Sequence, residues 1–515
     1  MSWRTRFPGT PREGQANLLD QIISSWDSTD VFVVSAPTGA GKQHIAKCLQ
    51  QLFPNSSYIT PTNVLLQQFL SNFPDSNTLH RIDSYWCNKW KRPCSETRKR
   101  KRVFCNTSRD QCKCQASSDI QLVRYSQRPT ATNYHIYLAH QIKREVLLVD
   151  EAHNLEAVIK DRLSVKLWQH DYQYPDRAYS VEQLLAWISS LPPKKLRGKK
   201  AQLLQASLMS LKPEYIVERS LEWFNGKGTK RGIPELRDCL KLTPVDIRNS
   251  PPQFWRNPVR KIVLMSATIN RKDVDILGLF RFSKRIKYFE CSSEIPADQR
   301  QTIYQRNKSL LVTYKHSKSP EYLNNLTILI EEIAEKHKEE KGVIHATYQL
   351  ADRLRSTLAT KERYMFHYQG EDKHLKYKQF LASKEPKIFV ASGMYEGIDL
   401  PDDLGRFQII AKIPWMSLGN PAIRYLSETD PEYYTWEALK RTIQACGRIT
   451  RSKEDWGVTY IIDRTWERLI ESSQRLELVP QWFKESIVNT DGTYMAKTRT
   501  LSSSDTSIRM EITGV

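Results

Sequence analysis

Short apolar runs, separated by amphipathic stretches, repeat along most of the chain. In the first half, Val31–Val34, Val146–Val149 and Val263–Met265 are apolar runs that end at small or charged residues. In the second half, runs at 343–344, 388–390 and 409–410 follow a helical face made of Tyr322, Leu326, Leu329, Ile330 and Ile333. Strands that alternate with helices predict parallel sheets. The expected fold class is therefore α/β, and 515 residues are enough for two or more domains.

The first run leads into a glycine-containing loop. Its residues are Ala36, Pro37, Thr38, Gly39, Ala40, Gly41 and Lys42. Glycines let successive backbone N–H groups close around a phosphate, and a lysine at the end of such a loop reaches the β- and γ-phosphates. One residue departs from the usual pattern: Gln43 stands where a Ser or Thr hydroxyl normally binds Mg²⁺. An amide oxygen also binds hard cations, although less compactly.

The second run leads into the sequence Asp150-Glu151-Ala152-His153. Here Asp150 is the expected Mg²⁺ ligand and Glu151 the carboxylate that activates water. Taken alone, the first loop could be a turn before a helix, and the second motif an exposed acidic helix start. Both motifs, in this order and each after a short apolar run, predict hydrolysis of a nucleoside triphosphate.

Positive charge is in excess and clustered. The net charge is +21 and the isoelectric point is about 9.4, with clusters of Lys and Arg at 89–102 and 194–200. This pattern favours a polyanionic partner such as nucleic acid. We expect no membrane segment and no secretory signal, hence a cytoplasmic protein (bacterial, or in the host cytoplasm if phage-encoded) with reduced cysteines.

Five of the nine cysteines fall in one short window: Cys87, Cys94, Cys105, Cys112 and Cys114. So many thiols with no histidine among them suit a soft metal centre, either an iron–sulfur cluster with four thiolate ligands or a structural zinc, and the residues alone also leave open that no metal binds. No tight C-x₂-C knuckle is present, which disfavours a zinc ribbon. One cysteine is spare: Cys112 and Cys114 are close enough to compete for one position, and Cys94 is another candidate for the odd one out.

Further segments complete the expected site. Gln15 precedes the loop and is suited to hydrogen-bond an adenine edge, while Tyr58–Thr62 and Ser266–Thr268 end strands and suit nucleic-acid contact or coupling. In the second half the candidates are Glu396, Gly397 and Asp399, followed by Gln444, Arg448 and Arg451. We expect the two arginines to share one face of a helix and, across a cleft, to stabilise charge on the transferred phosphoryl group.

Together these motifs resemble the superfamily 2 helicases, and more specifically their XPD/DinG branch. Three features carry the closer resemblance: the cysteine cluster before D-E-A-H, the segment Thr132–Leu138, and Tyr395–Pro401, which is similar to a W-E-G-I-D-L-P signature with Tyr for Trp. The resemblance covers about residues 7 to 465, in the order of the family. The compact length resembles bacteriophage or bacterial members.

This resemblance implies an ATP-dependent DNA helicase that moves 5′ to 3′ on single strands and uses ATP, Mg²⁺ and a [4Fe–4S] cluster. The implied partners are single-stranded DNA and forked or tailed duplex DNA, and the implied active form is a monomer. It assigns catalysis to Lys42, Asp150, Glu151, His153, Gln444, Arg448 and Arg451.

The resemblance also implies two RecA-like lobes, the first interrupted by two insertions. The expected parts are 1–80, 120–158 and 256–285 for lobe 1, 81–119 for the iron–sulfur insertion, 159–255 for a helical, arch-like insertion, 286–490 for lobe 2, and 491–515 for a polar tail. Within the arch, Val181, Leu184, Leu185, Ile188 and Leu191 form one apolar helical face.

Three alternatives remain open at this point. D-E-A-H also occurs in RNA-directed motors, so an RNA helicase or remodeller fits the motor motifs. A nucleic-acid-binding module with turnover weakened by Gln43 fits the departure in the phosphate loop. An exonuclease joined to a motor ranks last, because the sequence offers no further acidic metal cluster.

Overall fold

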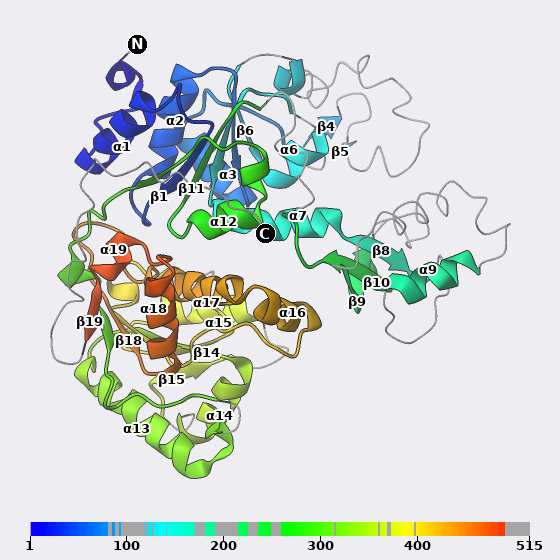
Figure 1. The fold of residues 1–515 in the computed structure, drawn as a ribbon. Helices are drawn as coiled ribbons and strands as arrows, with labels where there is room; N and C mark the ends of the chain where they lie inside the picture. Colours follow the sequence, from blue (N-terminus) through cyan, green and yellow to red (C-terminus); the bar gives the residue numbers. More distant parts are fainter. Residues whose placement is uncertain are drawn as a thin grey trace, which may run out of the picture. The chain divides into compact units, whose positions relative to one another are not determined.

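The computed structural model forms two compact units, each built around a parallel sheet (Figure 1). Unit 1 comprises Met1–Ser292 and Met416–Trp436, and unit 2 comprises Ser293–Trp415 and Glu437–Val515. The structure describes residues 2–80, 85–87, 92–93, 119, 122–125, 128–140, 142–169, 181–190, 215–224, 235–248, 259–313, 316–358, 361–367, 372–395 and 398–489.

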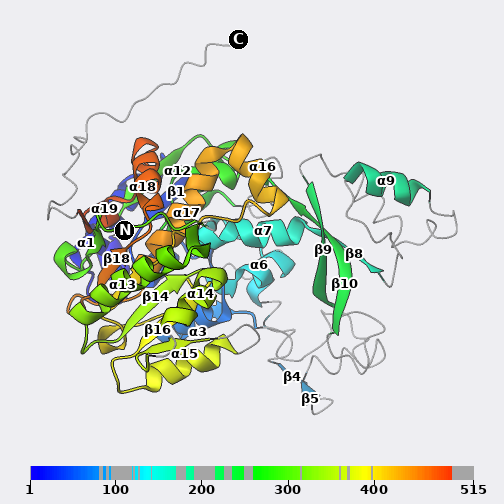
Figure 2. The same ribbon diagram turned by 90° about the horizontal axis from the view of Figure 1, so that it is seen from below.

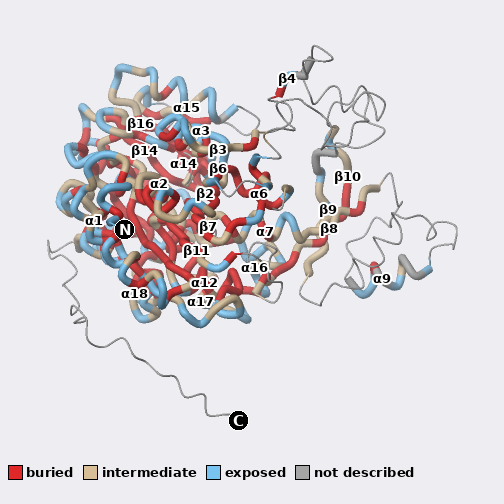
Figure 3. The backbone as a smooth tube through the Cα atoms, turned by 90° about the horizontal axis from the view of Figure 1, so that it is seen from above, coloured by how far each residue is buried: buried red, intermediate tan, exposed pale blue. Residues whose placement is uncertain are grey.

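The sheet of unit 1 has seven parallel strands in the order β12-β1-β11-β7-β2-β6-β3. The strands are β1 (Val31–Ser35), β2 (Ser56–Thr60), β3 (Asn77–Thr78), β6 (Thr130–Asn133), β7 (Val146–Asp150), β11 (Lys261–Ser266) and β12 (Ile286–Glu290). Its helices are α1 (Glu13–Ser24), α2 (Lys42–Leu52), α3 (Asn63–Asn72), α6 (Tyr134–His140), α7 (Leu155–Leu163), α12 (Arg271–Ile276) and α16 (Pro421–Thr429). All residues of β1, β2 and β7 are buried, because a parallel sheet covered on both faces has no solvent side. Figure 3 shows the buried interior in red.

Unit 2 repeats this plan with the strand order β15-β16-β14-β17-β18-β13-β19. The strands are β13 (Thr302–Tyr304), β14 (Gly342–Ala346), β15 (Tyr364–Phe366), β16 (Ile388–Ser392), β17 (Phe407–Ile410), β18 (Val458–Ile461) and β19 (Ile487–Asn489). Its helices are α13 (Pro320–Lys336), α14 (Tyr348–Leu358), α15 (Lys373–Ala382), α18 (Thr465–Arg475) and α19 (Gln481–Lys484). Short 3-10 turns lie at 3–6, 152–154, 279–281, 297–299, 316–318 and 402–404. The predicted α/β class with two parallel sheets is confirmed.

Two expected boundaries need correction. Strand β12 pairs with β1, so the first sheet extends past residue 285, and unit 1 ends at Ser292. The segment Met416–Trp436 also belongs to unit 1, although the second lobe was expected to run without interruption from 286. Neither assignment is visible in local patterns, because both depend on pairing between segments far apart in the chain.

The described residues of the arch-like insertion form more strand than the expected helical segment would have. Its described part holds one helix, α9 (Val181–Ser189), and a three-stranded antiparallel sheet in the order β8-β10-β9 (Figure 2). These strands are β8 (Val165–Trp168), β9 (Tyr215–Phe224) and β10 (Glu235–Pro244). Of the expected helical face, Leu184 is buried, and Leu191 lies outside the described residues. The apolar and polar residues of 235–244 largely alternate, which is a strand signal that the helical prediction overlooked.

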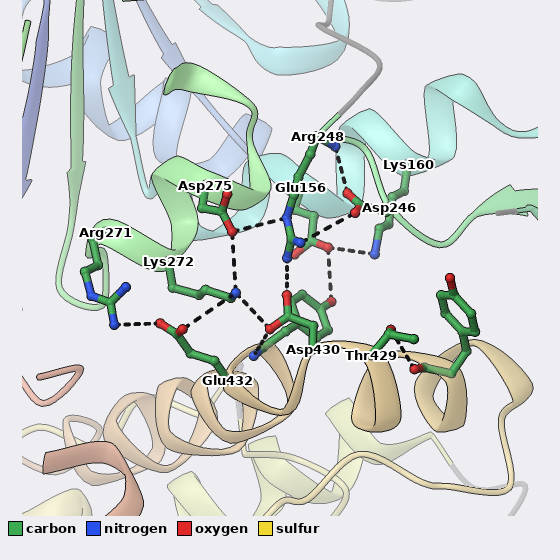
Figure 4. A network of polar contacts seen from close by, with 12 residues as sticks. Glu156, Lys160, Asp246, Arg248, Arg271, Lys272, Asp275, Thr429, Asp430 and Glu432 are labelled. Carbon is green, nitrogen blue, oxygen red and sulfur yellow. Dashed lines mark hydrogen bonds and ion pairs between the residues drawn. The ribbon is translucent and has the colours of Figure 1, made fainter. Parts of the chain in front are cut away.

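Helix α17 (Pro431–Cys446) begins in unit 1 and ends in unit 2. Figure 4 shows the charged network that holds its beginning. Asp430 accepts hydrogen bonds from Lys272 Nζ at 2.8 Å, from Arg248 and from the backbone N–H of Tyr433 at 3.0 Å. Trp436, which is fully buried, donates from its indole N–H to Asp273 Oδ1 at 3.1 Å. The start of α17 is therefore fixed to α12 by the Lys272–Asp430 ion pair and the Trp436–Asp273 hydrogen bond, while Asp430 caps its first turn.

Candidate active site

The glycine-containing loop joins β1 to α2, as the sequence predicts. Gly39 and Gly41 have φ values of +84° and +73°, which a residue with a side chain adopts only under strain. A Cβ atom on Gly41 would lie 2.1 Å from Gln15 Nε2. Lys42 is the first residue of α2, so the loop presents its N–H groups at a helix N-terminus, where an anion is stabilised.

The amide of Gln15 binds the loop itself in this structure. Its Nε2 donates to Ala40 O at 3.0 Å, and its Oε1 accepts from the Arg12 N–H at 3.0 Å. Arg12 Nη1 donates to Gly39 O at 2.9 Å. These contacts hold successive carbonyl groups of the loop, and they use the amide that the sequence suggested for adenine.

Lys42 and Glu151 bring the two predicted motifs together. Lys42 Nζ lies 3.4 Å from Glu151 Oε1 and donates to Ala36 O at 3.4 Å. Strands β1 and β7 flank β11 in the sheet, so their carboxyl ends lie at the same edge. Glu151 has φ +49° and ψ 48°, a left-handed conformation that costs about 1–3 kcal/mol and is typical of functional sites.

Asp150 is buried at the end of β7. Its Oδ1 accepts from the backbone N–H of Glu151 at 3.1 Å, and its Oδ2 accepts from the hydroxyl of Tyr58 at 2.6 Å. Burial and then the neighbouring negative charge of Glu151 raise the pKa of Asp150 to about 6, although Lys42 acts in the opposite direction. A buried carboxylate in this state gains from a bound cation, which fits the predicted magnesium ligand.

His153 connects this motif to the end of β11. Its Nε2 accepts from Asn154 Nδ2 at 2.7 Å, so the proton lies on Nδ1, which donates to Ser266 Oγ at 2.7 Å. The same hydroxyl oxygen of Ser266 accepts from the Thr268 N–H at 3.2 Å. The predicted Ser266–Thr268 segment therefore contacts the D-E-A-H motif directly.

Gln43 points toward α3. Its Oε1 accepts a hydrogen bond from Asn72 Nδ2 at 3.2 Å. The amide oxygen that replaces the usual hydroxyl therefore has one hydrogen-bond donor in this structure and keeps a second lone pair.

In unit 2, Arg448 and Arg451 do not lie on a helix. Helix α17 ends at Cys446, Gly447 follows, and both arginines lie in the turn and loop beyond it, so the expectation of a shared helical face is wrong. The guanidinium of Arg451 forms an ion pair with Asp399, another predicted site residue. The N–H of Leu400 donates to Arg448 O at 3.0 Å. The two predicted motifs of this unit are thus joined to each other.

Residues that the sequence did not reveal hold this end of α17. Gln408 Nε2 donates to the carbonyl oxygens of Ala445 and Cys446, both at 3.0 Å, and its Oε1 contacts His345 Nε2 at 3.1 Å. Burial, only partly offset by the hydrogen bond that His345 Nε2 donates to Gln408 Oε1, lowers the pKa of His345 to about 4. This imidazole is therefore neutral near pH 7. The only sign of this contact in the sequence is that Gln408 and His345 are polar residues next to short apolar runs that form neighbouring strands.

Several predicted residues lie outside the described part of the chain: Glu396, Gly397, Cys94, Cys105, Cys112 and Cys114. The backbone of Cys87 forms part of the short strand β4 (Trp86–Cys87), which pairs with β5 (Arg92–Pro93). Among the residues that the structure does describe, no group of three or more His, Cys, Asp or Glu side chains is arranged to hold a metal ion. Nor is any helix of these residues long and apolar enough to cross a bilayer.

Comparisons with known proteins agree with this geometry. A family model described as a helicase C-terminal domain matches residues 330–486, and one described as the res subunit of type III restriction enzymes matches residues 9–179. The chain is 27% identical over 249 residues to an ATP-dependent DNA helicase DinG of Photobacterium profundum; the match covers 44% of this chain.

A solved structure titled XPD helicase has the same fold. It aligns with a TM-score of 0.61 at 15% identity and covers 94% of this chain and 100% of that one. The chain is XPD/DinG-like. Its two parallel-sheet units have the RecA-like fold of the two lobes in that structure. A further relative, the helicase subunit XPD of the general transcription and DNA repair factor IIH of Dictyostelium discoideum, is 29% identical over 104 residues, which are 18% of this chain and 13% of that protein. The chain spans about a third of the DinG relative, since the match covers 34% of it.

Proposed function

We propose that this chain is an ATP-dependent DNA helicase that couples ATP hydrolysis to movement on single-stranded DNA. The observation that carries the proposal is the arrangement of Lys42, Asp150 and Glu151 at one edge of the sheet, with Lys42 Nζ 3.4 Å from Glu151. The similarity to DinG and XPD supports DNA as the partner. The net charge of +21 supports a polyanionic partner in general.

The residues of the first unit fit ATP with Mg²⁺. The loop from Ala36 to Gly41 has the backbone geometry for phosphate, and Lys42 would bind the β- and γ-phosphates. Mg²⁺, when bound, would neutralise phosphate charge, and Asp150 would hold it; a buried carboxylate next to that of Glu151, at the end of β7, is the donor set that fits a cation here. Glu151 would orient the attacking water and take its proton.

The remaining site residues are given supporting roles in this proposal. Gln15 would exchange its hydrogen bond to Ala40 for one to adenine, and His153 would hold the D-E-A-H segment against Ser266. In the second unit, Glu396, Gly397 and Asp399 would contact the nucleotide, and Gln444, Arg448 and Arg451 would stabilise charge on the transferred phosphoryl group. Arg451 would first have to leave its ion pair with Asp399.

We further propose that four of Cys87, Cys94, Cys105, Cys112 and Cys114 bind a [4Fe–4S] cluster. The donor set fits, because such a cluster takes four thiolates and five are available within one segment. Its contribution would be structural, since a short and highly charged insertion buries too little apolar surface to fold alone. The proposal extends to 5′ to 3′ movement, to forked or tailed duplexes as substrates and to a monomer as the active form. All three follow from the resemblance to the family.

The decisive experiment is ATP hydrolysis by anaerobically purified protein without nucleic acid, with single-stranded DNA, and with single-stranded RNA of the same sequence. Glu151→Gln is the matched control, because it keeps the size of the side chain and removes the carboxylate. Stimulation by DNA alone would support the proposal and would lead to unwinding assays on duplexes with 5′ or 3′ tails. Equal or greater stimulation by RNA would support an RNA remodeller instead.

A second outcome concerns Gln43, whose amide oxygen is held by Asn72. If wild-type turnover is near zero under every condition and rises in Gln43→Thr, the chain is a nucleic-acid-binding module with weakened hydrolysis. If the wild type already hydrolyses ATP rapidly with DNA, the hypothesis of a binding module with weakened hydrolysis is overturned.

A further inference from the structure

Two buried tyrosine hydroxyls end at the D-E-A-H motif. Tyr58, on β2, donates to Asp150 Oδ2 at 2.6 Å. Tyr134, the first residue of α6, donates to the carbonyl oxygen of Asp150 and lies 3.2 Å from that of Glu151. Both rings are fully buried, so each hydroxyl depends on this motif for its partner. Neither tyrosine would contact the nucleotide in the proposed function.

The contact from Tyr58 fixes the orientation of a carboxylate. Asp150 has one donor on each oxygen, the N–H of Glu151 on Oδ1 and the hydroxyl of Tyr58 on Oδ2. Two donors in different directions prevent rotation of the carboxylate plane, and each oxygen keeps lone pairs for a further ligand. The register of β2 and β7 pairs Tyr58 with Leu148, which brings its hydroxyl level with Asp150.

The contact from Tyr134 fixes a backbone. In an extended strand, successive carbonyl groups point in opposite directions, so one hydroxyl cannot reach two of them. Tyr134 reaches the carbonyl groups of both Asp150 and Glu151, because Glu151 adopts the left-handed conformation with φ +49°. The hydroxyl therefore stabilises the conformation that directs the Glu151 side chain toward Lys42.

We infer that Tyr58 and Tyr134 are positioning residues with separate tasks: Tyr58 orients the Asp150 carboxylate for the divalent cation, and Tyr134 holds the Glu151 backbone for activation of water. The inference rests on the proposed function. It extends that function to a tyrosine in each of two segments that the sequence suggested only for nucleic-acid contact and for family resemblance. It also separates binding of the metal from the chemical step, and this separation can be measured.

The test uses the full chain with Tyr→Phe substitutions, which remove one hydroxyl and keep the ring. The ring of Tyr58 stacks on Phe69 with centroids 4.0 Å apart, so Tyr58→Phe retains its packing. The matched control is Tyr304→Phe in unit 2, where a buried tyrosine donates to Glu467 at 2.9 Å outside the site. Binding of Mn²⁺ in the presence of ADP is followed by electron paramagnetic resonance, and kcat and KM for ATP are measured with saturating single-stranded DNA.

We expect Tyr58→Phe to weaken Mn²⁺ binding about 10- to 100-fold, as loss of a contact that orients a metal ligand does elsewhere. We expect Tyr134→Phe to lower kcat about tenfold, with Mn²⁺ binding and KM within twofold of the wild type. Tyr304→Phe should change neither quantity. Excess Mg²⁺ should restore turnover of Tyr58→Phe but not of Tyr134→Phe. This difference would assign Tyr58 to metal binding and Tyr134 to the chemical step.

The inference is overturned if Tyr58→Phe binds Mn²⁺ as the Tyr304→Phe control does, or if Tyr134→Phe keeps its kcat. Failure of the proposed function looks different, since the wild type itself would then show no Mn²⁺ binding with ADP and no turnover. Thermal unfolding of each variant identifies a general loss of folding. A variant with a lowered melting temperature is assayed below that temperature, and metal binding and kcat equal to the wild type there would overturn the inference as well.

Discussion

Replacing Asp430 by Asn should destabilise unit 1 by removing one charge from the network at the start of α17 (Figure 4). Asn is as good a helix N-cap as Asp, so the hydrogen bond from the Tyr433 N–H is retained. What is lost is the counter-charge of Lys272, whose side chain is only 7% exposed. Removing one partner of a buried ion pair costs about 3–5 kcal/mol.

The lower end of that range applies here, because Lys272 keeps Asp275 at 3.4 Å. We expect a loss of about 3 kcal/mol, which corresponds to a fall in melting temperature of at most about 6 °C for a unit of this size. Differential scanning calorimetry measures the change directly. The control is Asp161→Asn, which breaks a pair between Asp161 and Lys241 at 3.2 Å on the surface of the same unit and should cost at most about 1 kcal/mol.

A second substitution tests the cause. Adding Lys272→Met to Asp430→Asn removes the ammonium that was left without its closest partner, so part of the lost stability should return.

The pH dependence of the stability contributed by Asp430 has a defined sign. Burial alone would raise the pKa of Asp430, but the hydrogen bonds from Lys272 and Arg248 lower it below its usual value. The ion pair therefore stabilises the fold above about pH 4 and is lost as the pH falls through the lowered pKa.

The reasoning is refuted if Asp430→Asn melts within 1 °C of Asp161→Asn, or if the double variant is no more stable than Asp430→Asn. A difference between wild type and Asp430→Asn that grows below pH 4 would contradict the assigned charge of Asp430.

The remaining predictions concern the site, the second unit and the cysteine segment. Gly41→Ala should weaken ADP binding in equilibrium dialysis while the chain stays folded, because alanine adopts a φ of +73° only under strain and its Cβ, 2.1 Å from Gln15 Nε2, would displace that amide. The free energy of unfolding of unit 2 should fall by about 3 kcal/mol as the pH falls from 6.5 to 4. The reason is that His345, with a pKa of about 4, stays neutral in the fold, whereas the unfolded imidazole gains a proton. Urea unfolding of His345→Gln should lack this pH dependence, and the same dependence in that variant would contradict the prediction. Cys105→Ser should lose iron and unwinding while retaining part of its ATP hydrolysis, and an iron-free variant that still unwinds tailed duplexes would contradict a structural role for the cluster.

Local patterns in the sequence predicted about half of the strands in the two parallel sheets, chiefly the central ones, and the residues at their ends. The apolar runs at 31–34 and 146–149 became β1 and β7, and Lys42 became the first residue of the following helix. These features are local, since burial of a strand and the turn that follows it are encoded within about ten residues. The same reasoning failed at Arg448 and Arg451. Helix α17 ends just before Gly447, so both arginines lie beyond it. The last carbonyl groups of α17 accept hydrogen bonds from Gln408, which lies on strand β17.

The sequence by itself determined the α/β class, the order of the motifs and the chemistry that each one carries, because these depend on neighbouring residues. Only the tertiary structure decided which side chains meet. It brings Tyr58 and Tyr134 to Asp150, it engages Gln43 with Asn72, and it joins Met416–Trp436 to the first unit. Each of these contacts joins separate segments of the chain, and such pairings are fixed by strand register and core packing rather than by local sequence.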